Sequence, residues 1–232
     1  MKPAREAGRE EAARDEIDPA WLLRARRRMV DEQLRGRGIT DERLLAAFLS
    51  VPREGFVASR LRARAYEDRP LSIGHGQTIS QPYTVAVMCE ALELKGTEKV
   101  LEVGTGCGYA AAILASMARE VHTIEIVKEL ADAARERLQK LGCSTVTVHT
   151  GDGSLGLPIA APFDAIAVPA GAPKVPSTLL DQLAEGGRLV IPVGAAEQVQ
   201  EMQRWRRRGA GLSMDSLGQF VFVPLRGKLG TE

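Results

Sequence analysis

A glycine-rich turn is the segment of this sequence whose residue types and spacing point most directly to chemistry. In LEVGTGCGYA, Gly104, Gly106 and Gly108 stand between a short apolar run that predicts a strand and a longer one that predicts a helix. Glycines let the backbone pass close to a ligand, and the following helix would present free N–H groups to it. The spacing is GxGxG, and Tyr109 occupies the place where the dinucleotide fingerprint requires its third glycine. The turn therefore predicts a small-molecule site that does not meet the pattern for a nicotinamide dinucleotide.

Three acidic residues accompany this turn, each near the end of a predicted strand. Glu102 lies just before the glycines, Glu125 ends the next strand 21 residues after Gly104, and Asp152 stands between two glycines after the third. The end of the second strand is where a carboxylate bonds ribose hydroxyls in such sheets. Three carboxylates would repel a diphosphate, but they suit a ligand with a ribose, an adenine amino group and an ammonium. S-adenosyl-L-methionine has these groups and no phosphate, so the pattern predicts it as the cofactor.

The elements around the turn predict an α/β fold in which a parallel sheet positions these strand ends. Strands alternate with helices, which is the pattern of right-handed crossovers with helices on both faces of a sheet. The predicted strands are 99–103, 121–126, 145–149, 163–168 and 188–193, and the predicted helices are 109–118, 128–141 and 176–183. The tail predicts two more strands, 199–206 and 219–225, joined by a turn at 206–211. We therefore expect a doubly wound, mostly parallel Rossmann-like sheet with N-terminal helices and a C-terminal antiparallel β addition.

The N-terminal part of the sequence predicts an extension followed by helices. The first two dozen residues are mostly Ala, Arg and Glu. Asp18 and Pro19 have the types of a helix cap and a first helical residue, and a second helix is expected to start at Thr40-Asp41 and to end at Val51-Pro52. We expect residues 1–23 to be a flexible extension and residues 24–232 to form one domain. Within that domain we expect a helical part at 24–94, a Rossmann-like core at 95–195 and the β addition at 196–232.

Composition and charge argue against several classes of protein. Lys and Arg number 31 and Asp and Glu 30, so a net charge of +1 gives no strong field toward nucleic acid or anionic lipid. No run of about 18 apolar residues occurs, and the N-terminus lacks the apolar core of a secretory signal. The three cysteines and three histidines are widely spaced, so we expect no disulfide, no bound metal and a cytoplasmic location. They are Cys89, Cys107, Cys143, His75, His122 and His149.

An uncharged segment before the first of these strands carries a more specific signal. Residues 69–83 read RPLSIGHGQTISQPY, and a long loop of this kind beside a cofactor site is usually functional. Together with the glycine turn, this segment resembles the protein-L-isoaspartate (D-aspartate) O-methyltransferase family, most specifically in its TIS triplet. The resemblance runs from about Arg26 to Val223. Shorter matches are VPREGFV at 51–57, GDG at 151–153, APFDAI at 161–166, LVIPVG at 189–194 and FVPL at 222–225.

The resemblance implies a Rossmann-like methyltransferase domain with an enzymatic activity. The enzyme would transfer a methyl group from S-adenosyl-L-methionine to the free α-carboxylate of L-isoaspartyl residues, and the sequence leaves activity on D-aspartyl residues open. The ester would cyclise to a succinimide, whose hydrolysis returns some normal aspartate. The partners would be isoaspartyl-containing proteins and peptides, with no nucleic acid, membrane or metal.

The same resemblance assigns roles to residues that match the family's motifs. Ser80, the last residue of the TIS triplet, is implied as the active-site serine that contacts the substrate carboxylate, with Val85 and Val223 bordering the substrate. Pro169 departs from the family, whose members carry a small or hydroxyl residue there. The implied cofactor contacts are Gln77, Thr78, Ile79, Ser80, Glu102, Gly104, Gly106, Glu125, Ile126, Asp152 and Gly153.

Three other interpretations have sequence features of their own. DGSLG at 152–156 approaches the GxSxG motif of serine hydrolases, but an Asp replaces the first glycine. A nucleic-acid-binding module would use Arg24–Arg28 and Arg204–Arg208 around Trp205, and the near-neutral net charge argues against it. A methyltransferase for another small acid would share the glycine turn, and only the TIS triplet argues against it.

Overall fold

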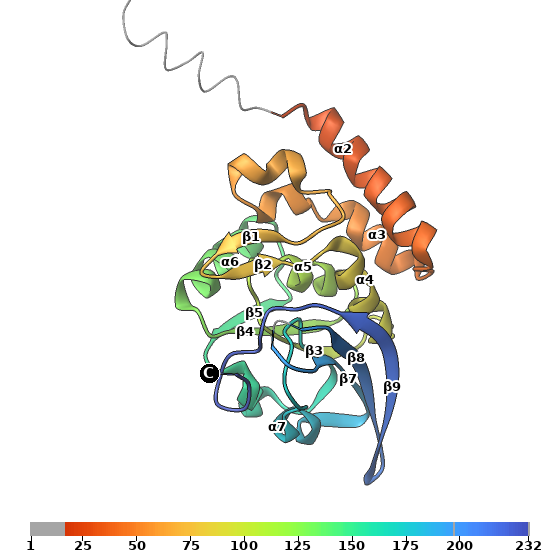
Figure 1. The fold of residues 1–232 in the computed structure, drawn as a ribbon, viewed down its shortest axis with the longest axis vertical. Helices are drawn as coiled ribbons and strands as arrows, with labels where there is room; N and C mark the ends of the chain where they lie inside the picture. Colours follow the sequence, from red (N-terminus) through yellow and green to blue (C-terminus); the bar gives the residue numbers. More distant parts are fainter. Residues whose placement is uncertain (1–16, 197, 232) are drawn as a thin grey trace, which may run out of the picture.

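A seven-stranded sheet in the order β5-β4-β3-β6-β7-β8-β9 forms the centre of the molecule (Figure 1). The computed structural model describes residues 17–196 and 198–231. Strands β3 to β7 run parallel, and β8 and β9 add antiparallel strands beyond β7. The strands are β3 (Lys99–Val103), β4 (Glu120–Glu125), β5 (Val146–Thr150), β6 (Phe163–Ala167), β7 (Leu183–Val193), β8 (Gln200–Arg208) and β9 (Gly211–Phe220). The expected doubly wound sheet with an antiparallel addition is confirmed.

The strand order reverses at β3, which pairs with β4 on one side and with β6 on the other. The chain leaves β3 toward one edge of the sheet and returns from β5 to β6 on the other side of β3. The loops that follow β3 and β6 therefore diverge, and ligands of open α/β sheets bind in the crevice between such loops.

Helices cover both faces of the parallel strands. Figure 1 shows α4, α5 and α6 above the sheet and α7 below it. Val100 packs into the hydrophobic cluster on the first face, and its neighbour Leu101 packs into the other cluster with Leu179 of α7. Burial on both faces explains why the strands read as nearly continuous apolar runs. The helices are α4 (Pro82–Ala91), α5 (Tyr109–Ala115), α6 (Lys128–Lys140) and α7 (Ser177–Asp181).

Short helical elements and a small hairpin precede the sheet. The Asp18 carboxylate accepts a hydrogen bond from the Ala20 N–H at 2.9 Å, and Asp41 caps α3 in the same way. Both predicted helix starts are therefore confirmed, and residues 19–23, which we expected in the flexible extension, are helical; residues 1–16 lie outside the described part of the chain. The elements are α2 (Pro19–Arg28), η2 (Met29–Leu34), η3 (Arg35–Arg37), α3 (Glu42–Ser50), η4 (Arg53–Phe56), η5 (Ser59–Arg64), β1 (Leu71–Gly74) and β2 (Gln77–Ile79).

The second strand of the C-terminal addition does not lie where the sequence predicted it. It is β9 at 211–220, rather than 219–225. Gly209 has φ +57, which allows a tight turn directly after Arg208, so the return strand begins at once. Most residues of β9 are exposed, so this edge strand lacks the apolar alternation by which a half-buried strand is recognised.

The helix predicted at 176–183 is shorter than expected, and the strand after it is longer. Helix α7 ends at Asp181, and Leu183 already pairs with Phe163 of β6. A Cβ on Gly187 would lie 3.1 Å from the Phe163 carbonyl oxygen, so this glycine lets β7 pass close to β6 where we expected a helix end. Among the helices of the described residues, none has both the length and the apolar character required to cross a membrane.

Candidate active site

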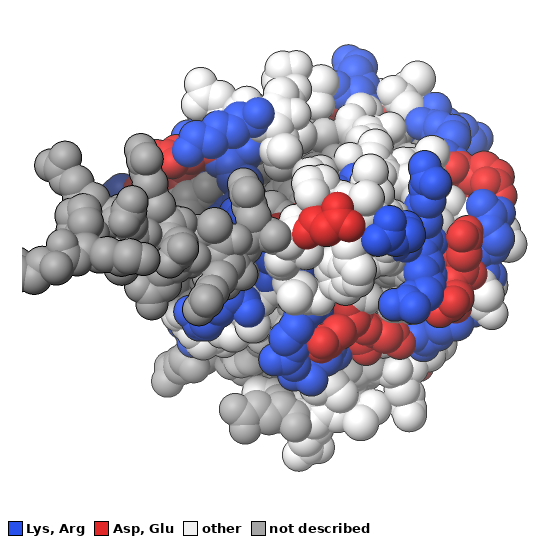
Figure 2. Space-filling view, turned by 90° about the horizontal axis from the view of Figure 1, so that it is seen from above, with Lys and Arg blue, Asp and Glu red and all other residues white. Residues whose placement is uncertain are grey.

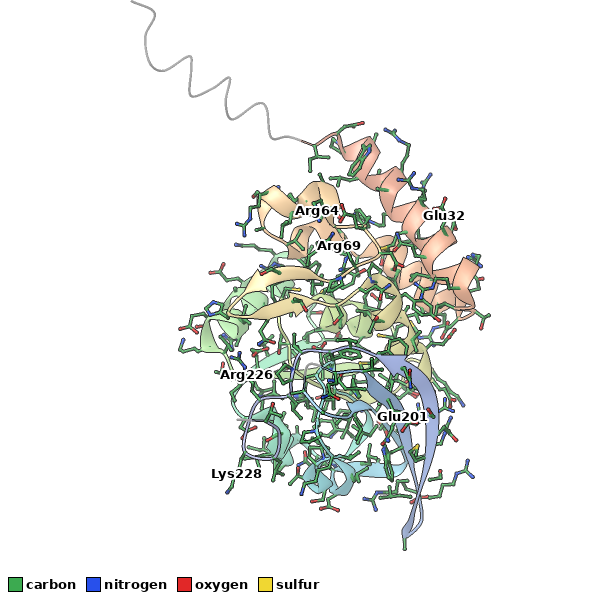
Figure 3. All side chains as sticks on the ribbon, in the orientation of Figure 1. Glu32, Arg64, Arg69, Glu201, Arg226 and Lys228 are labelled. Carbon is green, nitrogen blue, oxygen red and sulfur yellow. The ribbon has the colours of Figure 1, made fainter. Side chains whose placement is uncertain are left out.

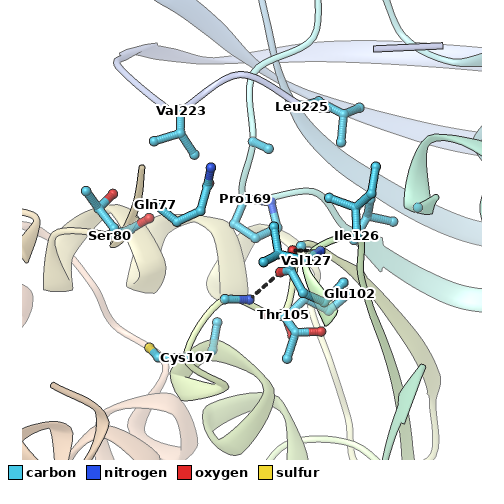
Figure 4. A pocket seen from close by; sticks show the side chains of 18 of the residues that line it. Gln77, Ser80, Glu102, Thr105, Cys107, Ile126, Val127, Pro169, Val223 and Leu225 are labelled. Atoms are coloured by element: carbon cyan, nitrogen blue, oxygen red, sulfur yellow. Dashed lines mark hydrogen bonds between the residues drawn. The ribbon is translucent and has the colours of Figure 1, made fainter. Parts of the chain in front are cut away.

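A pocket lies at the crevice that the strand order indicates, between the glycine turn, the β1–β2 hairpin and a C-terminal segment (Figure 4). Its unfilled space, including the open mouth, is about 810 Å³. All of the cofactor and substrate contacts implied by the resemblance line it except Asp152. Those that do are Gln77, Thr78, Ile79, Ser80, Val85, Glu102, Gly104, Gly106, Glu125, Ile126, Gly153 and Val223.

The glycine turn is packed too tightly for side chains at two of its positions. Gly106 has φ +52, and a Cβ there would lie 3.3 Å from Ile73 Cδ1 of the hairpin. Gly108 has φ +89, and a Cβ there would lie 3.2 Å from Leu138 Cδ1 of α6. The glycines therefore let the hairpin and α6 pack close to the start of α5.

Glu125 ends β4 and binds the glycine turn. Its carboxylate accepts hydrogen bonds from the Gly106 N–H at 2.8 Å and the Val127 N–H at 3.0 Å. The residue is 5% exposed and lines the pocket. This is the position at which a carboxylate can accept hydrogen bonds from the hydroxyls of a ribose.

Glu102, in β3, is the second carboxylate that faces the pocket. It is 1% exposed, and its Oε2 accepts a hydrogen bond from the Thr123 hydroxyl at 2.6 Å. Burial raises the pKa of Glu102 to about 8; the Thr123 hydrogen bond opposes this rise, and the nearby Glu125 adds to it. None of the ion pairs within residues 17–196 and 198–231 involves Glu102 or Glu125. Two buried carboxylates without a cationic side chain suit a ligand that carries positive charge.

Asp152 is the one predicted site residue whose side chain the structure directs elsewhere. Its carboxylate accepts hydrogen bonds from the Lys228 N–H at 2.8 Å, the Ser154 N–H at 2.9 Å and the Ser154 hydroxyl at 2.7 Å. Burial acts to raise the pKa of Asp152, but these hydrogen bonds outweigh it and hold the pKa below its usual value. A Cβ on Gly227 would lie only 2.0 Å from Asp152 Oδ1, so the C-terminal backbone passes directly over this carboxylate. The sequence predicted the correct strand end for this acid. It did not predict that the C-terminal segment would bind the Asp152 carboxylate.

Ser80 lies where two cavities meet. It lines the main pocket and also a smaller apolar cavity of about 290 Å³ that extends toward α4. Val85 and Pro169 border both cavities. The residue at which this sequence departs from the family pattern, Pro169, therefore lies within the site. Figure 4 shows Ser80, Gln77 and Val223 grouped on one side of the pocket, with Glu102 on the other. The site therefore has a serine side and a carboxylate side.

The C-terminal segment supplies pocket residues that the sequence analysis missed. Pro224, Leu225 and Arg226 line the pocket beside Val223. The segment is held to the loop after β6, because the Leu225 N–H donates to the Gly171 carbonyl at 2.8 Å. Figure 3 shows Arg226 and Lys228 on this segment, with Arg226 nearer the β1–β2 hairpin. The FVPL match at 222–225 was the signal that could have identified Pro224 and Leu225.

The serine of the hydrolase-like motif is not an exposed nucleophile. Ser154 is fully buried, and its hydroxyl donates to Asp152 while accepting a hydrogen bond from the Leu229 N–H at 3.0 Å. Its role is to hold the C-terminal segment, so this geometry gives no support to the serine hydrolase interpretation.

The arginine runs do not form a one-sided basic surface. Arg26 is buried and pairs with Glu54, and Arg204 and Arg206 both pair with Glu93. Figure 2 shows basic and acidic side chains interleaved over the described part of the face that it presents. Nothing in this arrangement favours the nucleic-acid interpretation.

Two histidines that are far apart in the sequence meet on neighbouring strands. His122 Nδ1 and His149 Nε2 lie 3.0 Å apart, and Glu120 bonds the other ring nitrogen of His122 at 2.8 Å. None of these residues lines the pocket. In the part of the chain that the structure describes, no group of three or more His, Cys, Asp or Glu side chains is placed to hold a metal ion.

The family model for protein-L-isoaspartate(D-aspartate) O-methyltransferase matches residues 24–230 of this sequence. The chain belongs to this family. The expectation drawn from the TIS triplet and the glycine turn is therefore confirmed.

Curated members and solved structures of the family resemble the chain over most of its length. The protein-L-isoaspartate O-methyltransferase 2 of Pelobacter propionicus is 55% identical over 203 residues, which are 87% of this chain and 90% of that protein. The enzyme of Methanoculleus marisnigri is 50% identical over 94% of this chain and 97% of its own. A solved protein-L-isoaspartate O-methyltransferase has a TM-score of 0.80 and 31% identity, covering 88% of this chain and 67% of that one. A Plasmodium falciparum structure of that description, in complex with S-adenosyl-L-homocysteine, has a TM-score of 0.75 and 26% identity, covering 87% and 98%.

Proposed function

We propose that this protein transfers a methyl group from S-adenosyl-L-methionine to the free α-carboxylate of L-isoaspartyl residues in proteins and peptides. The methyl ester would then cyclise to a succinimide, which starts the repair of the damaged residue. The observation that carries the proposal is the position of Ser80 of the TIS triplet, across one pocket from the buried carboxylates of Glu102 and Glu125. Membership of the family supports the same activity.

The residues of the carboxylate side fit the cofactor. S-adenosyl-L-methionine, when bound, supplies an electrophilic methyl group on a positively charged sulfur. Glu125 would accept hydrogen bonds from the ribose hydroxyls. The cationic part of the bound ligand would lower the raised pKa of Glu102, which would then supply negative charge beside it. Gly104 and Gly106 would let the backbone approach it closely.

The residues of the serine side would orient the substrate. The Ser80 hydroxyl would donate a hydrogen bond to the α-carboxylate, with Val85 and Val223 as apolar borders. A carboxylic acid with a pKa near 4 is already ionised at pH 7, so no general base is required to create the nucleophile. Ser80 therefore acts as an orienting group and forms no covalent bond. Holding the two reactants in line is worth up to about 7–11 kcal/mol, and the apolar lining helps to exclude water.

We also propose that residues 24–232 are the catalytic unit and that the protein acts in the cytoplasm. The extent of the family match supports the first statement. The three cysteines of the described residues are free, which suits a reducing compartment and supports the second.

Methyl transfer from labelled S-adenosyl-L-methionine tests the proposed activity. The substrate is an isoaspartyl peptide, and the matched control is the same peptide with normal aspartate. We expect a base-labile methyl ester on the isoaspartyl peptide alone. Transfer to free small acids but to neither peptide would favour the alternative methyltransferase, and binding of S-adenosyl-L-homocysteine without any transfer would reject the repair function.

Ser80→Ala tests the serine side by itself. Loss of a hydrogen bond to a charged group predicts a fall in kcat/KM for the isoaspartyl peptide of about 10- to 100-fold. The Kd for S-adenosyl-L-homocysteine, measured by calorimetry, should change little. Ser72→Ala, in β1 of the same hairpin, is the control and should leave both quantities near the wild-type values. Unchanged kcat/KM in Ser80→Ala would refute the assigned role.

A further inference from the structure

Arg53 is a fully buried arginine that lies outside the lining of the pocket. It lies in η4, within the VPREGFV match, and is 0% exposed. No ion pair among the described residues includes it, and burial lowers the pKa of its guanidinium. A buried charge without a counter-ion is costly, so packing alone is a poor reason for an arginine at this position.

The contacts of Arg53 connect the serine side of the pocket to the helical region before it. Nη2 donates a hydrogen bond to the Ser80 carbonyl oxygen at 2.8 Å, and Nε donates to the Ala65 carbonyl oxygen at 2.7 Å. The guanidinium carbon lies 4.9 Å from the ring centroid of Tyr109, at the start of α5. One planar group thus spans three segments, and one of them is the peptide group of the proposed orienting serine.

Arg26 is a neighbouring buried arginine with a different set of partners. Its guanidinium pairs with Glu54 at 3.0 Å and bonds the Tyr66 hydroxyl at 2.7 Å and the Leu49 carbonyl oxygen at 3.0 Å. These contacts tie α2 to α3 and η4, and Arg26 does not line the pocket. Arg26 therefore provides a control: a second buried arginine whose loss should cost stability without disturbing Ser80.

We propose that Arg53 is a positioning residue for methyl transfer, acting through Ser80. The bond from Nη2 fixes the direction of the Ser80 carbonyl, and so sets the backbone rotation that follows the Ser80 Cα. Fixing this peptide group holds the hydroxyl toward the pocket and the next residue, Gln81, at the start of α4. The uncompensated positive charge also lies behind the serine that receives an anionic group. This inference rests on the proposed role of Ser80.

The test is a double-mutant cycle between Arg53 and Ser80, with Arg26→Met as the structural control. Arg53→Met should lower kcat/KM for the isoaspartyl peptide by about 20-fold in the Ser80 protein and by less than about threefold in Ser80→Ala. The Kd for S-adenosyl-L-homocysteine should stay within about threefold of wild type, because the hydrogen bond reaches only the last residue of the triplet. Arg53→Lys keeps the charge but reaches at most one of the two carbonyls, and should recover part of the activity, to within about fivefold of wild type. Arg26→Met should lower the Tm with less than about a threefold effect on kcat/KM in either background.

The possible outcomes separate this inference from the proposed function. If Ser80→Ala is impaired but Arg53→Met lowers kcat/KM equally in both backgrounds, the inference about Arg53 is overturned and the proposed function stands. The same holds if Arg53→Met lowers kcat/KM no more than Arg26→Met does. Wild-type activity in Ser80→Ala would remove the role of Ser80, and the inference with it. If Arg53→Met does not fold, Arg53→Lys replaces it in the cycle: its loss of activity must disappear in Ser80→Ala, and a loss of equal size in both backgrounds refutes the proposal.

Discussion

The ends of the neighbouring strands β4 and β5 carry acidic residues that serve different parts of the molecule. Glu125 ends β4, faces the pocket and bonds only backbone N–H groups of the loops around it. Asp152 follows β5, does not line the pocket and bonds Ser154 and the Lys228 N–H of the C-terminal segment. The position of an acid relative to a strand therefore predicts its place in the sheet, whereas its role depends on what the distant tail brings to it.

The electrostatics of the two regions differ in the same way. In the pocket, burial raises the pKa of Glu102 to about 8, because no cationic side chain of the described residues compensates it. Under the tail, hydrogen bonds hold the pKa of Asp152 below its usual value despite burial. The charged form of Glu102 is therefore destabilised in the protein, whereas hydrogen bonds within the fold stabilise the charged form of Asp152.

Glu125→Ala should have the largest effect. The substitution removes the carboxylate proposed to bind the ribose, and also its hydrogen bonds to the Gly106 N–H of the glycine turn and to the Val127 N–H before α6. At about 1.5–3 kcal/mol for each hydrogen bond to a charged group, the Kd for S-adenosyl-L-homocysteine should rise by about 100-fold or more. Isothermal titration calorimetry measures it directly. The control is Glu129→Ala, which changes an exposed glutamate in the first turn of α6. An equal loss of affinity in Glu129→Ala, or no loss in Glu125→Ala, would contradict the assignment of Glu125 to the cofactor.

Much of the fold and most of the pocket could be predicted from the sequence. The glycine turn, Glu102 and Glu125 lie on consecutive elements of a regular β–α–β unit, so strand periodicity and spacing suffice to bring them together. Ser80 was found differently, through the resemblance carried by the TIS triplet, because no periodicity links the β1–β2 hairpin to the sheet.

The features that sequence reasoning missed depend on contacts between distant segments. The hydrogen bond that the Lys228 N–H donates to Asp152 joins residues 76 positions apart, and no local pattern records it. The pairing of His122 with His149 requires the exact register of β4 against β5, in which His149 stands opposite Ile124. Arg53 reads locally as one more charged residue of a helical region, and only the packed structure shows it to be fully buried. Long-range pairing and burial, rather than residue type, decide these roles.

Glu102→Gln should change how stability depends on pH, with a smaller effect than Glu125→Ala has on binding. In the folded state the pKa is about 8, above the ordinary value, so between these pH values the folded protein keeps a proton that the unfolded chain has lost. The free energy of unfolding of the ligand-free wild type therefore falls as the pH rises from about 4.5 to 8. Glutamine removes this slope, so the variant should gain about 4 °C or more in Tm over wild type near pH 8.5, and much less near pH 5.5.

The control for this measurement is Glu98→Gln. Burial also acts on Glu98, but hydrogen bonds from the backbone N–H groups of Lys95, Gly96 and Thr97 lower its pKa. Its contribution is therefore present above the unfolded pKa and lost on acidification, so Glu98→Gln should lose stability near neutral pH. A Glu102→Gln protein that loses Tm at high pH as Glu98→Gln does would show that Glu102 is satisfied by the fold, and would remove the contrast with Asp152.

Asp152→Asn should have the smallest effect on the cofactor and a local effect on the tail. The amide cannot accept from all three of the donors that now bind the carboxylate, so one bond is lost, at about 1–3 kcal/mol of stability. Because the pKa of Asp152 is depressed, this stabilisation is present at neutral pH and is lost as the pH falls through that lowered value. Hydrogen exchange of the Lys228 and Leu229 amides should accelerate in the variant at neutral pH, while exchange of the Gly106 amide stays as in wild type. The Kd for S-adenosyl-L-homocysteine should change by less than about threefold, since the carboxylate does not line the pocket and is held by the C-terminal segment. A loss of affinity as large as that of Glu125→Ala would instead assign Asp152 to the cofactor, as the family resemblance implies, and would require the tail to release it on binding.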